Sequence, residues 1–318
     1  MVDRTYFTEY HVLPFSCDPP TVLTQQSLLS SDRPTFRVSP FIKWAGGKAH
    51  LVPHLKPLIP SRIKKYYEPF LGGAALFFST FSSGRSFEAV LSDTNAELVS
   101  TFNVVKDSPE ELVRHLWKLR KQYLLASNKE RYYYAIRESE FDDSVDLAAR
   151  FIFLNKTCYN GLYRVNQDGK FNVPFGHYRN PRIFYEDNIV ASSRALLDTR
   201  ARIFSADYER ATEECEAGDF IYFDPPYDPT SKTSTFTSYT PDGFNRDDQA
   251  RLADWFAELV SRDCNVVLSN SDTEFIQRLY RRYKKISVEV NRPISCKGRG
   301  RTGFRELVIF NTPSRTRS

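Results

Sequence analysis

The stretch that decides the fold is Phe220-Ile221-Tyr222-Phe223-Asp224-Pro225-Pro226-Tyr227. Its first four residues form an apolar run that predicts a β-strand. The acid and the two prolines end that strand, because proline has no N–H group to donate to a neighbouring strand. In open α/β sheets, ligands gather at the carboxyl ends of the strands. The stretch therefore predicts one strand of such a sheet, with a site at its carboxyl end.

Strands and helices alternate on both sides of this stretch. Further strands are predicted at 66–70, 89–92, 202–205, 265–269 and 306–310. Helices are predicted at 74–81, 97–105, 112–125, 145–154 and 246–261. Strands separated by helices imply βαβ units around a parallel sheet. The fold class is therefore α/β.

A tyrosine-rich and turn-rich insert from about 130 to 190 interrupts the alternation. Within it, two extended segments at 163–167 and 170–174 flank Asp168-Gly169. Asp-Gly favours the positive φ angles of a type I′ turn, so the insert is predicted to carry a β-hairpin. We expect a small second domain at 126–199 and a larger one at 39–125 and 200–312. Residues 1–38 are rich in Pro, Ser and Thr and predict a disordered leader, and 313–318 a polar tail.

The composition excludes several classes of protein. Of the 318 residues, 41% are hydrophobic and 26% are charged, which is ordinary for a globular protein and argues against wholesale disorder or a fibre. No run of about eighteen apolar residues predicts a membrane span, and no secretory signal is recognisable. Five cysteines without a CxxC pattern indicate reduced thiols in a cytoplasm. The five histidines form no HExxH pattern and no Cys/His cluster, so no metal site is expected.

Charge is unevenly distributed along the chain. The net charge is +5, but residues 278–305 hold ten Lys or Arg and a single acid, Glu289. Such a run can contact phosphate groups, and it can equally be a solvated basic edge.

The residues 224–227 have the chemistry to hold an aromatic amine. The Asp224 carboxylate and a neighbouring proline carbonyl offer two acceptors to one –NH₂ group, and Tyr227 offers a flat face to a base. Two prolines keep this backbone rigid. The alternative is a proline-rich turn that merely closes a strand.

Two glycine-containing blocks lie upstream. In Glu68-Pro69-Phe70-Leu71-Gly72-Gly73, a glycine turn between strand and helix lets a ligand approach the backbone, and Asp93 ends the next strand where a ribose hydroxyl could bind. A tight structural turn is the alternative. In Lys43-Trp44-Ala45-Gly46-Gly47-Lys48, a Walker A loop is excluded because Ala49 stands where Ser or Thr is required. The block is then predicted to be a glycine loop with two cations, in which Trp44 lines a binding site. The alternative is that the Trp44 indole belongs to the hydrophobic core.

Together these blocks resemble the Dam-like family (D12 class) of DNA adenine-N6 methyltransferases, over about 85% of the chain and in the family's order. The resemblance implies a Rossmann-like S-adenosylmethionine-dependent methyltransferase sheet of seven mainly parallel strands, helices on both faces and a small helical/β-hairpin DNA-recognition domain at 126–199. The hairpin segments Tyr159-Asn160-Gly161-Leu162-Tyr163-Arg164 and Phe171-Asn172-Val173-Pro174-Phe175-Gly176 are similar to the family's target-recognition hairpin.

The resemblance also implies roles for individual residues. The catalytic residues would be Asp224, Pro225, Pro226 and Tyr227. The S-adenosylmethionine site would comprise Trp44, Lys48, Glu68, Phe70, Gly72, Gly73, Asp93, Asp207, Tyr208 and Asp224. The DNA contacts would be Lys43, Tyr159, Asn160, Leu162, Arg164, Pro174 and Tyr178. No metal is implied. The chain departs from the family in its long leader and in His177, which stands where relatives often have a basic residue.

The implied activity is methyl transfer from S-adenosyl-L-methionine to adenine N6 in double-stranded DNA, within GATC and by base flipping. We expect a cytoplasmic monomer that acts on the nucleoid, with no membrane partner. Two alternatives stay open from the residues. One is amino methylation of another substrate, such as cytosine N4, RNA adenine or a protein amide. The other is a non-catalytic DNA-binding relative. Asp at position 224 favours adenine, and the hairpin insert favours duplex DNA.

Overall fold

The computed structural model describes residues 38–229, 244–290 and 304–311. The leader predicted at 1–38, apart from Val38, and the tail predicted at 313–318 lie outside these residues. Part of the basic run at 278–305 also lies outside them, because 291–303 are not described.

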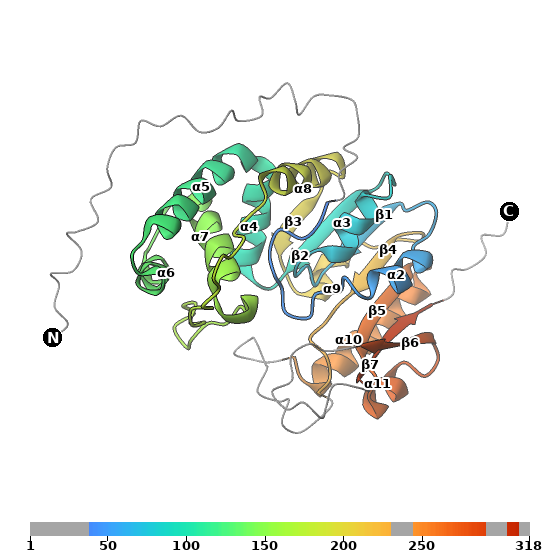
Figure 1. Cartoon of the computed structure of the whole chain (residues 1–318). Helices are drawn as coiled ribbons and strands as arrows, with labels where there is room; N and C mark the ends of the chain where they lie inside the picture. Colours follow the sequence, from blue (N-terminus) through green and yellow to red (C-terminus); the bar gives the residue numbers. More distant parts are fainter. Residues whose placement is uncertain (1–37, 230–243, 291–303, 312–318) are drawn as a thin grey trace. The chain divides into compact units, whose positions relative to one another are not determined.

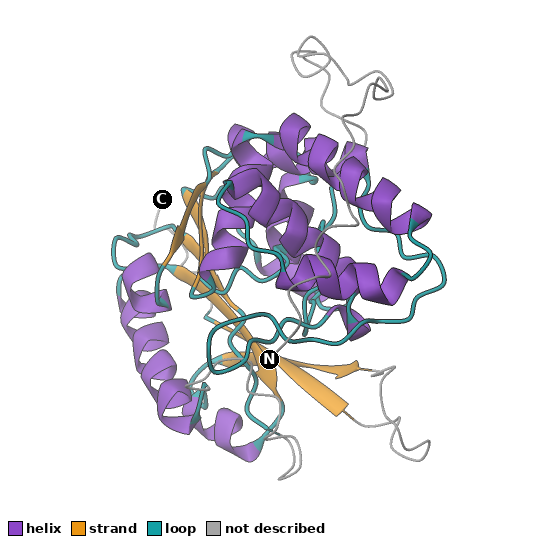
Figure 2. Cartoon of the chain, turned by 90° about the vertical axis from the view of Figure 1, so that its left-hand side faces the viewer, coloured by secondary structure: helices purple, strands orange, loops and turns teal. Residues whose placement is uncertain are grey.

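A seven-stranded sheet forms the centre of the described chain (Figure 2). Its strands are β1 (Lys65–Glu68), β2 (Glu88–Asp93), β3 (Arg202–Ser205), β4 (Phe220–Phe223), β5 (Asn265–Ser271), β6 (Lys284–Val290) and β7 (Phe304–Phe310). Their order is β3-β2-β1-β4-β5-β7-β6. All pairings are parallel except those of β7, which is antiparallel to both β5 and β6. The predicted α/β class and the mainly parallel sheet are confirmed.

The helices connect these strands in the predicted alternation (Figure 1). They are α2 (Val52–Leu55), α3 (Ala75–Phe81), α4 (Ala96–Asp107), α5 (Pro109–Leu125), α6 (Lys129–Glu138), α7 (Ser144–Thr157), α8 (Glu186–Asp198), α9 (Tyr208–Ala211), α10 (Arg246–Ser261) and α11 (Glu274–Leu279), with single 3₁₀ turns at η2 (Lys56–Leu58) and η3 (Tyr159–Gly161). Side-chain caps explain where several of them begin. Asn95 accepts the N–H of Leu98 at the start of α4, and Asn245 forms a capping box with Asp248 at the start of α10.

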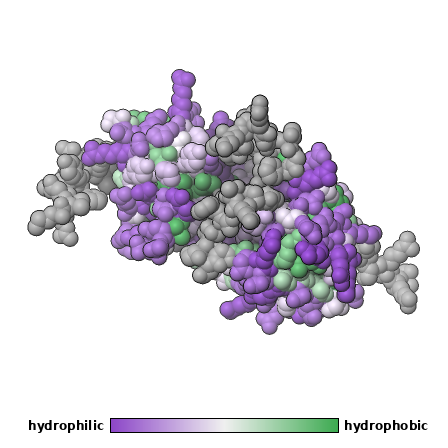
Figure 3. Space-filling view, turned by 90° about the horizontal axis from the view of Figure 1, so that it is seen from below, coloured by the Kyte–Doolittle hydropathy of each residue, from purple (hydrophilic) through white to green (hydrophobic). Residues whose placement is uncertain are grey.

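The sheet separates two hydrophobic clusters, because successive side chains of a strand point to opposite faces. On β4, Phe220 and Tyr222 belong to the first cluster, and Ile221 and Phe223 to the second. The first cluster also contains side chains of α3, α4, α5, α7 and α8, and the second contains side chains of α9, α10 and α11. The described surface in Figure 3 is largely hydrophilic, with small hydrophobic patches. None of the described helices is long and apolar enough to cross a membrane.

The predicted hairpin is present, but its turn differs from the prediction. Val165 and Phe171 form an antiparallel bridge, and the Asn166 N–H donates to the Lys170 carbonyl at 2.9 Å. Gly169 has a φ of 73°, whereas Asp168 does not adopt a positive φ, so the type I′ turn was wrong. The Asn166 side chain accepts the N–H groups of Asp168 and Lys170, and this Asx-type capping stabilises a three-residue loop instead.

The insert is packed into the larger part of the chain. α7 lies against α4 and α5, and the first hydrophobic cluster runs without interruption from Phe41 and Phe102 to Phe153 and Phe175. The two segments predicted as separate domains therefore share one core. Their boundaries at 126 and 199 stay a proposal.

Candidate functional site

Polar side chains gather where the central parallel strands end. Glu68 is the last residue of β1, Asp93 is the last residue of β2, and Asp224 follows β4 directly. The carboxyl ends of parallel strands lie at one edge of a sheet, which is where open α/β sheets bind ligands. Three acids from separate sequence blocks are thus placed at one edge.

Asp224 is held by a cation and a hydroxyl group. The Lys48 Nζ lies 2.8 Å from Asp224 Oδ1, and the Ser269 Oγ donates to the same oxygen at 2.7 Å. Ser269 is itself in hydrogen-bond contact with the Tyr222 hydroxyl at 2.9 Å. Burial raises the pKa of the Asp224 carboxyl, and the Lys48 ammonium opposes that rise. The glycine loop at 43–48 and the segment 224–227, called the catalytic tetrapeptide below, therefore meet at this ion pair.

The ring and the hydroxyl group of Tyr227 each contact a charged side chain. The Lys48 Nζ lies 4.5 Å from the centre of its ring, within cation–π range. Its hydroxyl donates to Glu306 Oε2 at 3.2 Å, and His50 Nε2 lies 3.1 Å from the same oxygen. Glu306 is buried and belongs to β7, so the last strand of the sheet supports the tetrapeptide.

Buried amides hold the proline backbone of the tetrapeptide. Gln249 of α10 donates through Nε2 to the Pro226 carbonyl at 2.7 Å, and Asn270 of β5 donates to Gln249 Oε1 at 3.0 Å. Asn270 also accepts the N–H of Asp228 at 3.1 Å. Within the described residues, the Pro225 carbonyl accepts no hydrogen bond, so it is available to a ligand.

Glu68 is a buried carboxyl group with two donors. Tyr66 donates its hydroxyl to Glu68 Oε2 at 2.7 Å, and the Phe77 N–H donates to the same oxygen at 3.2 Å. Burial raises the pKa of Glu68 to about 8, and the neighbouring Asp224 adds to the rise. The group is therefore protonated near pH 7, and a cation placed beside it would favour its ionised form.

The glycine turn, Trp44 and Asp93 form one unit. Gly72 has a φ of 45°, and a Cβ atom there would come within 2.8 Å of Trp44 Cδ1, so the indole needs a glycine beneath it. The Gly72 N–H donates to Asp93 Oδ2 at 3.2 Å, and the Asn95 N–H donates to Asp93 Oδ1 at 3.0 Å. The carboxylate as a whole can accept a further hydrogen bond from a ligand hydroxyl.

Phe70 and Tyr208 form an aromatic pair at the same edge of the sheet. Their ring centres lie 5.6 Å apart, and Phe244 meets Phe70 edge-on at 5.9 Å. Asp207 caps α9 by accepting the Glu209 N–H, and its other oxygen lies 3.1 Å from Arg251 Nη2. Asp207 is therefore ion-paired with α10, directly beside Tyr208 in the chain.

The predicted DNA-contacting residues divide into two groups. In the first, the Lys43 Nζ lies 4.7 Å from the centre of the Tyr178 ring, and the Lys43 backbone bonds to the side chain of Asn155. Tyr159 is half exposed and donates its N–H to the Pro174 carbonyl at 2.8 Å. Next to Tyr159, Asn160 has a φ of 55°.

The second group lies on the hairpin. Arg164 is exposed and donates to Asn172 through Nε at 2.6 Å and through Nη2 at 3.2 Å. No acid among the described residues pairs with its guanidinium. Leu162 is half-buried and packs against the first hydrophobic cluster, whereas Pro174 is exposed.

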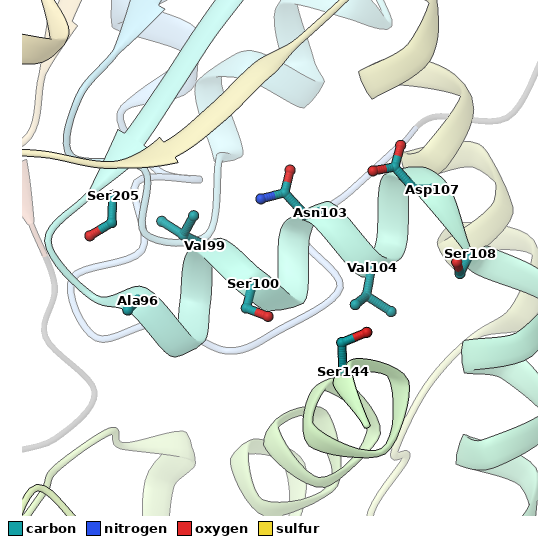
Figure 4. Close-up of a pocket in the computed structure, with 9 residues that line it drawn as sticks. All are labelled: Ala96, Val99, Ser100, Asn103, Val104, Asp107, Ser108, Ser144 and Ser205. Atoms are coloured by element: carbon teal, nitrogen blue, oxygen red, sulfur yellow. The ribbon is translucent and has the colours of Figure 1, made fainter. Parts of the chain in front are cut away.

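A separate pocket lies along one side of α4 (Figure 4). Its lining residues are Ala96, Val99, Ser100, Asn103, Val104, Asp107, Ser108, Ser144 and Ser205. None of the predicted catalytic, cofactor or DNA residues lines it. In the described part of the chain, no three His, Cys, Asp or Glu side chains are grouped as a metal site would require.

The sequence analysis missed several residues of the site. Ser269, Gln249 and Asn270 carry no motif, and they reach the tetrapeptide only because β5 and α10 pack beside β4. Glu306 of β7 and His50 carry no motif either, and they come together near Tyr227 only in the folded chain. A carboxylate at the head of an otherwise apolar strand, as in Glu306-Leu307-Val308-Ile309-Phe310, is the signal that could have indicated Glu306.

The strand order, the reversed β7 and the acids at the strand ends define the class of protein, which is the Rossmann-like methyltransferases. The profile of the D12 class N6 adenine-specific DNA methyltransferases matches residues 44–294. The chain belongs to this family.

Named relatives match the chain over almost their whole length. The Type II methyltransferase M.MjaIII of Methanocaldococcus jannaschii is 42% identical over 289 residues, which cover 86% of this chain and 99% of that protein. The Type II methyltransferase M1.LlaDCHI of Lactococcus lactis subsp. cremoris is 39% identical, with 86% and 95% covered. The DNA adenine methylase of Escherichia coli (strain K12) is 35% identical, also with 86% and 95% covered.

Family and fold imply the use of S-adenosylmethionine, and the residues at the strand ends fit it. The open lone pairs of Asp93 suit ribose hydroxyls, and the Phe70–Tyr208 pair offers an aromatic surface. Glu68, whose pKa is raised by burial and which has no cationic partner among the described residues, can become a counter-charge for the positive end of the cofactor.

Proposed function

We propose that this adenine-specific methyltransferase modifies adenine N6 within GATC in double-stranded DNA, by flipping the target base out of the helix. One observation supports the catalytic assignment above the others. The Asp224 carboxylate stands at the end of β4, beside the free carbonyl of Pro225 and the ring of Tyr227. The names of the relatives agree with adenine as the base and with a place in a type II restriction-modification system.

The mechanism follows from what adenine N6 lacks. Its lone pair is delocalised into the ring, so N6 is a weak nucleophile. Asp224 and the Pro225 carbonyl each accept a hydrogen bond from one of the two N6–H groups, which localises the lone pair on nitrogen. The cofactor supplies the methyl group. Holding N6 in line with that methyl group makes a bimolecular step effectively unimolecular.

Base flipping is required because N6 is inaccessible in a stacked duplex. Tyr227 stacks on the extruded base, and Glu306 fixes the orientation of the phenol ring. Lys48 binds Asp224 in the free protein and holds that acceptor in place until the base arrives. We further propose that the S-adenosylmethionine site comprises Trp44, Lys48, Glu68, Phe70, Gly72, Gly73, Asp93, Asp207 and Tyr208.

The variant Asp224→Asn tests the catalytic role. It keeps the size of the side chain but removes the charge of the acceptor, so methyl transfer to an unmethylated plasmid is expected to fall about 10²-fold or more. Asp263→Asn is the matched control, because Asp263 is exposed and has a φ of 58°, which asparagine adopts readily. Wild-type turnover by Asp224→Asn with an unchanged melting temperature would refute the assignment. Mapping the modified base in the same assay separates adenine N6 from cytosine N4.

Arg164 tests the recognition sequence. We propose that its guanidinium, oriented by Asn172, contacts guanine O6 and N7 from the major groove. Arg164→Ala should then lose about 1–3 kcal/mol on GATC and tolerate substitution at one position of the site. Lys170→Ala on the same hairpin is the control, since among the described residues the Lys170 ammonium pairs with the exposed Glu140 alone. Equal loss on GATC and on all its single-base variants would assign Arg164 to phosphate instead.

We also propose that the protein acts as a monomer in the cytoplasm, where DNA is its partner. The proposed DNA contacts from Lys43, Tyr159, Asn160, Leu162, Pro174 and Tyr178 all come from one chain. Light scattering on the protein with a GATC duplex should give the mass of one chain per site. A mass of two chains per site would contradict this.

A further inference from the structure

Tyr163 stands between the two residues proposed to read DNA from the hairpin. Arg164, which follows it, is exposed, and side chains alternate along an extended chain, so the Tyr163 ring points inward, where it packs against the first hydrophobic cluster. Its ring stacks on Trp44 at 5.7 Å with the planes 26° apart, and it also contacts the rings of Phe151 at 5.6 Å and Phe171 at 5.8 Å. The outward side chain of Arg164 and the inward ring of Tyr163 therefore share one short piece of backbone.

The hydroxyl of Tyr163 contacts a different element. It donates to Glu97 Oε2 at 2.7 Å, and Arg150 Nη1 lies 3.7 Å from the other oxygen of Glu97. Glu97 is in the first turn of α4, two residues after the cap residue Asn95. The Asn95 N–H donates to Asp93 Oδ1, so this contact leads to the acid proposed to bind ribose.

The ring of Tyr163 leads to the same acid by another route. Trp44, against which it stacks, covers Gly72 so closely that a Cβ there would lie 2.8 Å from the indole. The Gly72 N–H donates to Asp93 Oδ2 at 3.2 Å. Both carboxylate oxygens of Asp93 are thus connected to Tyr163, one through α4 and one through the glycine turn.

We propose that Tyr163 is a positioning residue that couples sequence recognition by the hairpin to cofactor binding at Asp93. This inference rests on the proposed function. A shift of the hairpin backbone that brings Arg164 onto its base must also move Tyr163, and with it Trp44 or α4. Such coupling is reciprocal, so cognate DNA tightens cofactor binding by the factor by which the cofactor tightens DNA binding.

The test measures this factor directly. Calorimetry gives the dissociation constant of S-adenosylhomocysteine, which permits no turnover, for the protein alone and with a GATC duplex. The ratio of the two constants should be about 5- to 150-fold in the wild type, the usual range of coupling. Tyr163→Phe, which keeps the stack and loses the hydroxyl, should lower the ratio about threefold or more. Tyr163→Leu should abolish it.

Tyr133→Phe is the matched control. Its hydroxyl also holds the hairpin, by donating to the Val173 carbonyl at 2.8 Å, but it contacts neither Trp44 nor Glu97. The ratio should stay at the wild-type value in this variant. A double-mutant cycle of Tyr163→Phe with Glu97→Ala should be non-additive, because each change breaks the same hydrogen bond.

Two results would overturn the inference. One is an unchanged ratio in both Tyr163→Phe and Tyr163→Leu, and the other is equal loss in Tyr133→Phe. Failure of the proposed function looks different, because the wild type itself would then neither methylate nor discriminate GATC duplexes. A wild type that methylates GATC but gives a ratio of one would overturn only the coupling.

Discussion

At the scale of single residues, Glu68 makes stability depend on pH in an unusual direction. Its folded pKa is about 8, against about 4.5 for an exposed carboxyl, because it is buried beside Asp224. Between these values the folded chain holds a proton that the unfolded chain releases. Stability therefore falls as pH rises from about 4.5 to about 8, and the effect is on the order of a few kcal/mol.

Glu68→Gln should remove this dependence. Glutamine keeps an acceptor for Tyr66 and Phe77 but does not titrate, so the variant should gain on the wild type as pH rises from 5 to 8. Denaturant unfolding at pH 5, 6.5 and 8 measures the difference. Glu88→Gln, which removes an exposed carboxylate from the same sheet, controls for the loss of one charge. Parallel curves for wild type and Glu68→Gln would contradict the pKa.

At the scale of elements, Gln249 connects α10 to the catalytic tetrapeptide. Gln249→Leu leaves the buried Asn270 amide without its acceptor, at a cost of about 1–3 kcal/mol, and removes the donor to the carbonyl of the exposed Pro226. We expect a lower melting temperature and, because the tetrapeptide backbone loosens, a lower kcat. Gln277→Leu on α11 is the control, since within the described part of the chain the Gln277 side chain bonds to Asp272 alone. Normal kcat in a destabilised Gln249→Leu would limit Gln249 to a structural role.

Sequence could predict the elements whose burial is uniform. β4 was recognisable because all its residues are buried and apolar. β6 was missed, because this edge strand begins with Lys284-Lys285 and alternates in exposure. The turn type was missed because the Asn166 side chain, rather than the Asp168 backbone, decides the geometry of the hairpin loop. The local pattern of hydrophobic residues indicates a strand or helix, but it does not indicate which side chains determine the geometry of its ends and turns.

Some residues of the site could also be predicted from sequence, and others could not. Asp224, Asp93 and Glu68 were predictable, because each ends a strand and the ends of parallel strands meet. Glu306 was not, because it reaches Tyr227 through antiparallel pairing of β7 with β5, in which it stands opposite Ser271. That register joins residues far apart in sequence, and no local period encodes it.

At the scale of the whole molecule, cofactor binding should stabilise the fold. A ligand at about 100 times its Kd adds roughly 2.7 kcal/mol to the free energy of unfolding. Asp93→Ala removes charge-assisted bonds worth about 1.5–3 kcal/mol each, so the rise in melting temperature with S-adenosylhomocysteine should shrink or vanish. Asp198→Ala, which breaks only an exposed pair with Arg194, should keep the full rise. An undiminished rise in Asp93→Ala would leave Asp93 as a cap for the turn at Asn95.

The shared core of the insert has a consequence for engineering new specificities. Exchanging the whole segment 126–199 between relatives would cut through the cluster that contains Phe102 and Phe153, so such chimeras should misfold. The hairpin offers a smaller cassette. It is closed at its base by the hydrogen bond from Tyr159 to Pro174, and most of its loop is exposed. Grafts should therefore begin after Tyr163 and end before Phe171, which leaves the buried aromatic residues of the host untouched.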